Sequence, residues 1–261
     1  MSRNILQGLV GAWCPSLGPS GYTLLDRSGR GRHGTLTNMD AGTDWLASPG
    51  GWVMDYDGSN DYTVIGSANS QFINTALTLT GWLNTTVSGG DTTNAVIASC
   101  VSNGFTANFA VTVNITGGTN KLNMWNTAAG ATVNSATSVN TGAWIFWTVT
   151  RDASTTKIYI NGREDASAAT GTPDTSTTQG LSIGRIGAFN GYYTPMQCGD
   201  IGIWHRTMTA PEVWQLWQMG QAGLGRLLTP QRRSYAFRVP AAAVKSYLFV
   251  NRGQVIGGGT L

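Results

Sequence analysis

Helix-forming charged residues are almost missing from this chain. Before residue 220 it contains two glutamates and two lysines, which are Glu164, Glu212, Lys121 and Lys157. Glycine is abundant, with 35 residues, and charged residues make up 11% of the chain, against roughly 25% in an average soluble domain. Because the remaining polar residues are mostly turn and strand formers, this bias predicts an all-β protein with many turns.

Short strand-like runs recur between turn signals, with the spacing expected of a β-sandwich. Run 144–151 is mostly apolar on both faces at its start, so we expect it to be a central strand. The dipeptide Asn161-Gly162 is typical of a turn at a strand end. The predicted strands are 9–13, 53–56, 62–65, 77–83, 95–100, 108–113, 121–125, 144–151, 157–160, 181–186 and 199–204.

One helix is predicted near residue 210. The sequence Thr209-Ala210-Pro211-Glu212 has the spacing of a capping box, with proline inside the first turn, where its missing N–H costs nothing. Val213, Leu216 and Trp217 then form an apolar stripe, and Gly220 is a typical stop.

Charge divides the chain into two parts. Residues 221–261 carry six cations and no acid, whereas the first 220 residues carry ten cations and thirteen acids. Such asymmetry often marks a tail with a partner of its own. We therefore predict a sandwich over residues 1–220 and a basic C-terminal arm over residues 221–261, with strands at 235–239 and 246–251.

Four sequence stretches follow one another along the first 220 residues. They are the apolar run 8–13, the Asp/Ser/Gly loop 25–35, the Asp-Gly turn at 55–62, and the closing segment from residue 144 to the helix. In this order they resemble the laminin-G-like branch of the concanavalin A-like lectin/glucanase family. The resemblance implies an all-β, two-sheet antiparallel jelly-roll sandwich with one short C-terminal helix.

The chain has three cysteines, an odd number at wide spacing, which suits neither a disulfide framework nor a zinc site. Unpaired thiols are the simplest interpretation. The resemblance, however, makes the first and last strands neighbours. A disulfide between Cys14 and Cys198 is therefore the alternative to test.

Catalysis is not expected. Glycoside hydrolysis usually needs two carboxyl groups that flank the bond, yet Glu212 is explained as a helix cap and Glu164 sits in a turn. His33 and His205 lie in a loop and at a strand end, and the chain has no Gly-x-Ser-x-Gly elbow. The sequence therefore predicts a protein that is not an enzyme.

The resemblance also implies a metal site. In the family, aspartates at the places of Asp26 and Asp200 help to bind one structural Ca²⁺ ion. The usual Asp-Asp pair before the last strand is Gly199-Asp200 here, so one ligand is missing. The alternative is that these aspartates, like the cluster at 55–61, simply form turns.

Exposed aromatic residues next to amides are the usual partners of sugars. The loop with Phe189, Asn190, Tyr192 and Tyr193 is therefore the predicted ligand-binding patch. Core packing is the simpler explanation for most of the ten tryptophans.

The arm mixes cations with aromatic residues. A disordered tail and a nucleic-acid-binding arm are two interpretations, but the apolar run 247–250 favours a third, an arm that adds strands to a neighbouring subunit. The predicted assembly residues are Arg232, Arg233, Tyr235, Phe237, Arg238, Lys245, Tyr247, Phe249 and Arg252.

The leading functional hypothesis is a non-catalytic phage virion protein, a capsid decoration (cement) protein anchored by its arm. It would reach the virion surface without a signal peptide, bind capsid or other virion proteins, and form homo-oligomers, with a trimer as a candidate. The alternative is a calcium-assisted carbohydrate-binding or adhesion module with a glycan ligand. No membrane partner is expected, because no stretch approaches the ~18 apolar residues of a membrane helix, and nucleic acid is not an expected partner either.

Overall fold

The computed structural model of the chain describes residues 4–66, 72–87, 95–101, 107–113, 120–126, 131–170, 180–186, 192–221, 247–250 and 254–257. For residues 95–101, 107–108, 126, 131–132, 247–250 and 254–257 it describes the backbone alone. The chain divides into two units, Met1–Thr229 and Pro230–Leu261.

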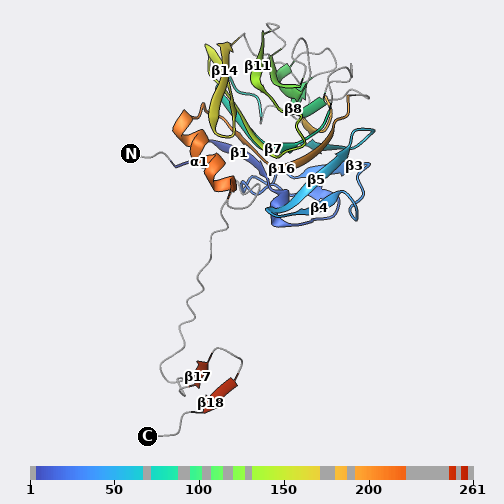
Figure 1. Cartoon of the computed structure of the whole chain (residues 1–261), viewed down its shortest axis with the longest axis vertical. Coiled ribbons are helices and arrows are strands. Elements are labelled where there is room, and N and C mark those ends of the chain that lie inside the picture. Colours follow the sequence, from blue (N-terminus) through green and yellow to red (C-terminus); the bar gives the residue numbers. More distant parts are fainter. Residues whose placement is uncertain are drawn as a thin grey trace. The chain divides into compact units, whose positions relative to one another are not determined.

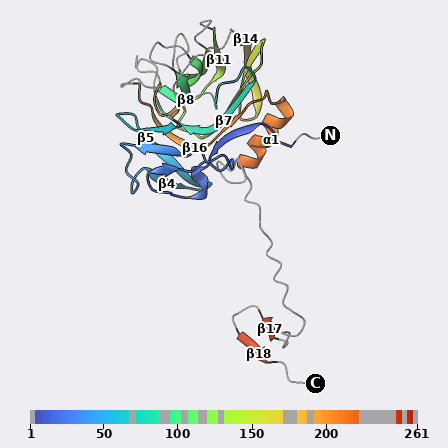
Figure 2. The same ribbon diagram turned by 180° about the vertical axis from the view of Figure 1, so that it is seen from behind.

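The first unit is an antiparallel sandwich of two sheets (Figures 1 and 2). One sheet, here called sheet A, has the order β14-β13-β12-β7-β16-β5-β4, and β1 also pairs with β16. Its strands are β1 (Leu9–Trp13), β4 (Trp45–Ser48), β5 (Gly51–Asp57), β7 (Leu77–Asn84), β12 (Ile145–Arg151), β13 (Thr155–Ile160), β14 (Arg163–Ala169) and β16 (Pro195–Trp204).

The second sheet, sheet B, has the order β11-β10-β9-β8-β15-β6-β3-β2. Its strands are β2 (Thr23–Leu24), β3 (Gly34–Thr37), β6 (Tyr62–Ile65), β8 (Ala95–Val101), β9 (Ala107–Val113), β10 (Lys121–Asn126), β11 (Ala131–Ser138) and β15 (Leu181–Ile183). A 3-10 turn, η1 (Pro15–Leu17), follows β1.

The main core fills the space between the two sheets. Trp13, Trp147 and Ile65 are fully buried there, and burying a side chain of this size contributes roughly 1.5–3 kcal/mol. Strand β12 is buried at every position, which confirms that run 144–151 forms a central strand. Each predicted strand of the first 220 residues coincides with an observed one.

The first and last strands of the sandwich are neighbours. In β1 and β16 the pairs run from Leu9 with Trp204 to Trp13 with Ile201. The Trp204 indole donates to the carbonyl of Ile5 at 2.9 Å, and Arg206 Nε donates to the carbonyl of Gln7 at 2.7 Å. This closure places the segment after β16 against the start of the chain.

Helix α1 (Ala210–Gln221) follows the last strand, as predicted. The Glu212 carboxylate accepts hydrogen bonds from the backbone N–H of Thr209 at 2.8 Å and from its hydroxyl at 3.0 Å. The Arg206 guanidinium is paired with the same carboxylate at 2.9 Å. The helix therefore begins with its glutamate as a cap. Among the described residues, no helix is long and apolar enough to cross a membrane.

Cys14 and Cys198 are both free cysteines. Cys14 packs in the cluster beneath α1, and Cys198 packs in the core between the sheets. The two side chains lie on opposite sides of sheet A, so the disulfide considered from the sequence is wrong. The first and last strands are indeed neighbours, but the two cysteines point to different faces.

In the second unit, β17 (Tyr247–Val250) pairs with β18 (Gln254–Gly257) as an antiparallel hairpin. The predicted strand at 246–251 corresponds to β17. The predicted strand at 235–239 lies outside the described residues.

Candidate functional site

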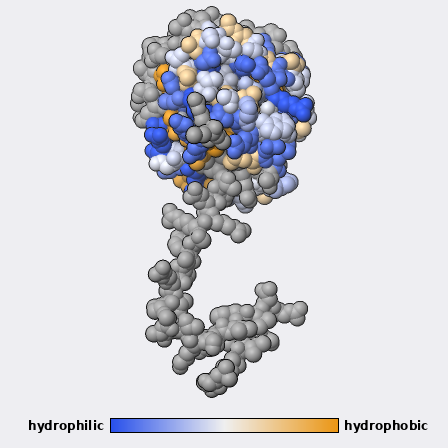
Figure 3. All heavy atoms as spheres, turned by 90° about the vertical axis from the view of Figure 1, so that its left-hand side faces the viewer, coloured by the Kyte–Doolittle hydropathy of each residue, from blue (hydrophilic) through white to orange (hydrophobic). Residues whose placement is uncertain are grey.

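The outer face of sheet A is divided between a covered part and an open part. Helix α1 covers one part, where a second hydrophobic cluster forms. Its buried members are Leu9, Ala12, Cys14, Trp82, Phe146, Tyr159, Trp204, Met208, Val213 and Leu216. Viewed from the side of α1, hydrophobic residues on the surface form small separate patches among hydrophilic ones (Figure 3).

Three polar side chains from neighbouring strands lie across the open part. Gln197 of β16 pairs with Asp55 of β5 on one side and with Asn84 of β7 on the other. We call Asp55, Gln197 and Asn84 the polar row. All three are half-buried, whereas the adjacent Tyr56 and Met196 are buried in the main core. Because residues directly opposite each other on neighbouring strands point to the same face of a sheet, the three side chains share one face.

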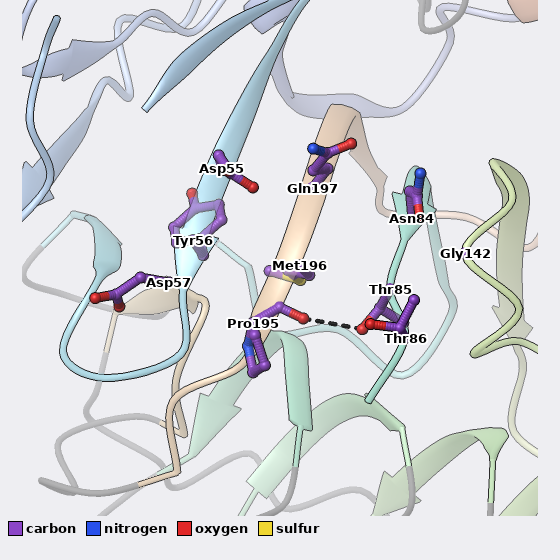
Figure 4. A pocket seen from close by; sticks show the side chains of 10 residues that line it. All are labelled: Asp55, Tyr56, Asp57, Asn84, Thr85, Thr86, Gly142, Pro195, Met196 and Gln197. Atoms are coloured by element: carbon purple, nitrogen blue, oxygen red, sulfur yellow. Dashed lines mark hydrogen bonds between the residues drawn. The ribbon is translucent and has the colours of Figure 1, made fainter. Parts of the chain in front are cut away.

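The polar row lines a cleft of about 350 Å³ (Figure 4). The other lining residues are Tyr56, Asp57, Thr85, Thr86, Gly142, Pro195 and Met196. The Thr85 hydroxyl donates to the carbonyl of Pro195 at 2.9 Å, which ties the end of β7 to the start of β16. Carboxylate, amide and hydroxyl groups thus gather in one hollow, and such groups bind hydroxyl-rich ligands through hydrogen bonds.

The turn that follows β5 forms one rim of the cleft. Gly58 there has φ +76°, and a Cβ atom on it would lie 2.4 Å from Cδ of Pro195. The turn therefore approaches the start of β16 more closely than any other residue type would allow at this position.

The cleft is acidic. Burial raises the pKa of Asp55, and the negative charge of Asp44 adds to the rise, while the Gln197 amide opposes it. Burial would also raise the pKa of Asp57, but hydrogen bonds from the backbone N–H groups of Ser59 and Asn60 outweigh it and lower that pKa. None of the ten lining residues is cationic. The cleft therefore favours neutral ligands over anionic ones.

A smaller hollow of about 260 Å³ lies nearby on the same face. We call it the tryptophan pocket, and its lining residues are Trp82, Trp144, Asn161, Trp217 and Gln221. Trp144 and Trp217 are half-buried, so parts of both indoles face solvent. The side-chain oxygen of Asn161, Oδ1, accepts a hydrogen bond from the backbone N–H of Phe146 at 2.9 Å. This bond fixes the Asn161 side chain at the turn after β13.

The predicted aromatic patch is only partly within the described residues. Phe189 and Asn190 lie outside them. The Tyr193 ring packs against Tyr62, with ring centroids 6.2 Å apart, and the Arg185 guanidinium lies 3.5 Å from the Tyr62 ring centroid. Tyr192 is half-buried, with φ 110°. Neither tyrosine lines the cleft of Figure 4, so a ligand-binding role for this loop stays a prediction.

The carboxylate of Asp26 holds its own loop together. It accepts hydrogen bonds from the backbone N–H groups of Ala12, Ser28 and Arg32 at 2.8–3.0 Å and from the Ser28 hydroxyl at 2.9 Å. Burial would raise its pKa, but these bonds lower it. Because these donors point their hydrogens at both oxygens, a calcium ion at Asp26 would have to displace some of these hydrogen bonds.

Asp200 is used in a similar way. It is 1% exposed, and it accepts hydrogen bonds from the backbone N–H of Ser16 at 3.1 Å and from its hydroxyl at 2.9 Å. Among the described residues, no group of three or more His, Cys, Asp or Glu side chains is arranged to hold a metal ion. Calcium binding at Asp26 and Asp200 stays a prediction that only a binding measurement tests.

The predicted arm residues have no described side chains. Arg232, Arg233, Tyr235, Phe237, Arg238, Lys245 and Arg252 lie outside the described residues. Tyr247 and Phe249 are seen only as backbone, in β17. Their assembly role therefore stays a prediction too.

The sandwich with its outward cleft defines a concanavalin A-like domain. A family model described as the concanavalin A-like lectin/glucanases superfamily matches residues 57–214, more than half of the chain. The chain therefore belongs to this superfamily, as the sequence resemblance implied. A comparison with curated proteins gives no significant match.

Solved structures share the fold at low sequence identity. Domain 4 of AbnA, an extracellular GH43 arabinanase from Geobacillus stearothermophilus, solved in complex with arabinotriose, is 17% identical with a TM-score of 0.58 over 79% of this chain and 97% of that one. The binding domain of Paraclostridial Mosquitocidal Protein 1 is 13% identical with a TM-score of 0.60, over 82% of this chain and 52% of that one.

Trypanosoma rangeli sialidase in complex with sialic acid is 14% identical with a TM-score of 0.59, over 84% of this chain and 34% of that one. The chain thus spans about a third of the length of the sialidase chains that it matches. At these identities the likeness concerns the fold alone.

Proposed function

We propose that the chain is a non-catalytic carbohydrate-binding module whose ligand lies in the cleft of Figure 4. The observation that carries the proposal is the polar row. Asp55, Gln197 and Asn84 offer carboxylate and amide groups side by side, on strands whose ladder holds them in fixed register. Such groups recognise the hydroxyl groups of a sugar with little loss of side-chain freedom.

The fold and its relatives support this proposal. Domain 4 of AbnA was solved with arabinotriose, and the mosquitocidal protein domain is described as a binding domain. The acidic lining argues for a neutral sugar, because a sialic acid carboxylate in the cleft would face Asp55, which points toward Gln197 (Figure 4), without a cation among the lining residues. Neutral arabino-oligosaccharides are therefore the first probes.

The non-catalytic part of the proposal rests on the two glutamates, and a hydrolysis assay tests it because the cleft does contain two aspartates, Asp55 and Asp57. Glu212 caps α1 and pairs with Arg206, and Glu164 pairs with Lys157 at 2.9 Å on the surface. Neither lines the cleft. The proposed binding also needs no metal ion, so EDTA is expected to leave it unchanged.

A glycan array that carries neutral and sialylated oligosaccharides tests the proposal. We expect binding to neutral glycans, and an Asn84→Ala or Gln197→Ala variant should lose roughly tenfold or more in affinity, the effect of removing a central polar contact. Gln215→Ala, on an exposed position of α1, is the matched control and should bind like the parent. An array without any hit, or equal binding by all variants, would refute the proposal.

We also propose that the second unit is an assembly element. Its hairpin pairs Leu248 with Ile256 and Phe249 with Val255, so two successive cross-strand pairs consist of apolar residue types. A single hairpin of this kind is marginal in water, and pairing with strands of another chain would stabilise it. Attachment to a phage capsid, as a decoration protein at the virion surface, is the finer form of this hypothesis.

Light scattering on the full chain and on a chain ending at residue 222 tests the assembly proposal. A larger mass for the full chain and a monomer for the truncated one would support it. Monomers in both cases would refute self-assembly. If the capsid hypothesis is right, phage capsids should bind the full chain and should not bind the truncated chain.

A further inference from the structure

The tryptophan pocket lies beside the cleft on the same face of sheet A. Trp82 and Asn84 are two residues apart on β7 and so share a face, about 7 Å from each other along the strand. Gly142 lines the cleft, and Trp144, two residues further along, lines the tryptophan pocket. One strand and one loop therefore contribute to both hollows.

Gly199 is a buried glycine that packs against two tryptophans of the pocket. It follows Gln197 by two residues on β16, and a Cβ atom on it would lie 2.8 Å from Cβ of Trp82 and 3.8 Å from the Trp144 ring. Any side chain at this position would clash with Trp82 and stand between the polar row and the two tryptophans. The missing side chain therefore lets Trp82 and Trp144 pack close to β16, beside the polar row.

The pocket has the chemistry of a sugar subsite. An indole face packs against the C–H face of a sugar ring, and amide groups at the edge bind its hydroxyl groups. Trp144 and Trp217 supply indoles that are partly exposed, and Gln221 and Asn161 supply exposed amides. Because the side-chain oxygen of Asn161 already accepts from the backbone N–H of Phe146, the NH₂ group of that amide is the part that can donate to a sugar hydroxyl.

We infer that the cleft and the tryptophan pocket bind adjoining stretches of one linear, neutral glycan chain, with two units in the cleft and the following units in the pocket. The inference rests on the proposed function, and it adds that the ligand is an extended oligosaccharide rather than a single terminal sugar. The polar row holds the first two units through hydrogen bonds, and the tryptophans hold the following units through stacking. Affinity should therefore increase with chain length.

Calorimetry with arabinobiose and arabinohexaose, and with matched pairs of xylose, glucose and galactose polymers, tests this inference. The parent should bind the hexasaccharide of the preferred series roughly tenfold or more tightly than its disaccharide. Trp144→Ala and Trp217→Ala should lose this length dependence while binding the disaccharide as the parent does. Trp144→Phe, which keeps an aromatic face, should retain most of it.

Trp52→Ala is the matched control, since Trp52 is exposed on β5 and lines neither hollow. The hexasaccharide should also change the tryptophan fluorescence of the parent more than the disaccharide does, which tests the pocket without a substitution. Unchanged length dependence in both alanine variants, with Asn84→Ala still defective, would overturn the inference and leave the proposed function standing. Failure of the parent to bind any of the glycans would overturn both.

Discussion

Cys14 and Cys198 lie on opposite sides of the same sheet. Burial raises the pKa of the Cys14 thiol well above its ordinary value, and the negative charge of Asp200 adds to the rise. Burial raises the pKa of Cys198 as well. Because the thiolate is the reactive form, both thiols should be inert in the folded protein.

A thiol assay with Ellman's reagent checks this expectation on a Cys100→Ser variant, which removes the third cysteine. We expect no reaction in buffer and reaction of both remaining thiols in guanidinium chloride. A disulfide would show itself by the absence of reaction in guanidinium without a reducing agent, and that result would contradict the structure.

Asp61 should make stability depend on pH. Burial, together with the charges of Asp57 and Asp44, raises its pKa from 3.8 to about 6. The folded protein thus holds this proton more tightly than the unfolded chain, so the contribution to stability is complete below pH 3.8 and is lost as the pH rises through about 6. Asp61→Asn should therefore stabilise the protein at pH 7, by about 1–3 kcal/mol, and show little difference at pH 3.5.

Denaturant unfolding at several pH values measures this difference. Asp152→Asn is the control of opposite sign, because backbone N–H groups of Ser154 and Thr155 lower the pKa of Asp152. The contribution of Asp152 to the free energy of unfolding is present at neutral pH and is lost as the pH falls through its pKa. Parallel pH profiles for the parent and Asp61→Asn would show that Asp61 titrates normally.

Arg151 fastens the segment before β7 to the core. It is fully buried, and its guanidinium donates to the carbonyls of Thr75 at 3.1 Å and Asn74 at 2.5 Å. Arg151→Met keeps much of the volume but leaves these carbonyls without their donor, so the free energy of unfolding should fall by about 2–4 kcal/mol. Chemical denaturation measures the loss, and Arg30→Met, on an exposed loop, should change stability by less than about 0.5 kcal/mol.

Gly58 sets the shape of the cleft rim. Gly58→Ala would force the turn after β5 away from Pro195, so it should destabilise the fold by about 1–3 kcal/mol and weaken glycan binding. Gly29→Ala separates the two causes, because Gly29 also has a positive φ, +84°, but a Cβ atom there meets nothing within 4 Å. Equal losses of stability in the two variants would mean that backbone strain, rather than contact with Pro195, explains the effect.

Much of the fold was predictable because its central strands carry their own signal. Strands β7 and β12 are buried on both faces; β12 begins with an apolar run, and β7 alternates leucine with threonine before Trp82. The strands that the pattern missed include β4, β11 and β14, which lie at sheet edges. Strand β14 has the sequence REDASAA and an exposed or half-buried position throughout, and such polar edge strands resemble loops in sequence.

The candidate site was less predictable. Asp55 and Asp57 stood out as part of an acidic turn, but Asn84 and Gln197 are separated by more than a hundred residues and become neighbours only through strand order. Trp144 and Trp217 were assigned to packing, because a sequence pattern does not tell which edge of a half-buried indole stays open. Asn161, which lines the same pocket as these two tryptophans, lies in a turn that the sequence pattern predicted correctly.

The pairing of β1 with β16 has a mechanical consequence. The chain enters β1 at Leu9, directly opposite Trp204, where β16 ends. A pulling force applied through the segments before β1 and after β16 would act on the same end of this ladder, so the residue pairs would open one after another, as in a zipper. The hydrogen bonds from the side chains of Trp204 and Arg206 to the carbonyls of Ile5 and Gln7 would be the first interactions to resist this separation of the strands. Under tension along this direction the sandwich should yield at low force, even though its core is well packed.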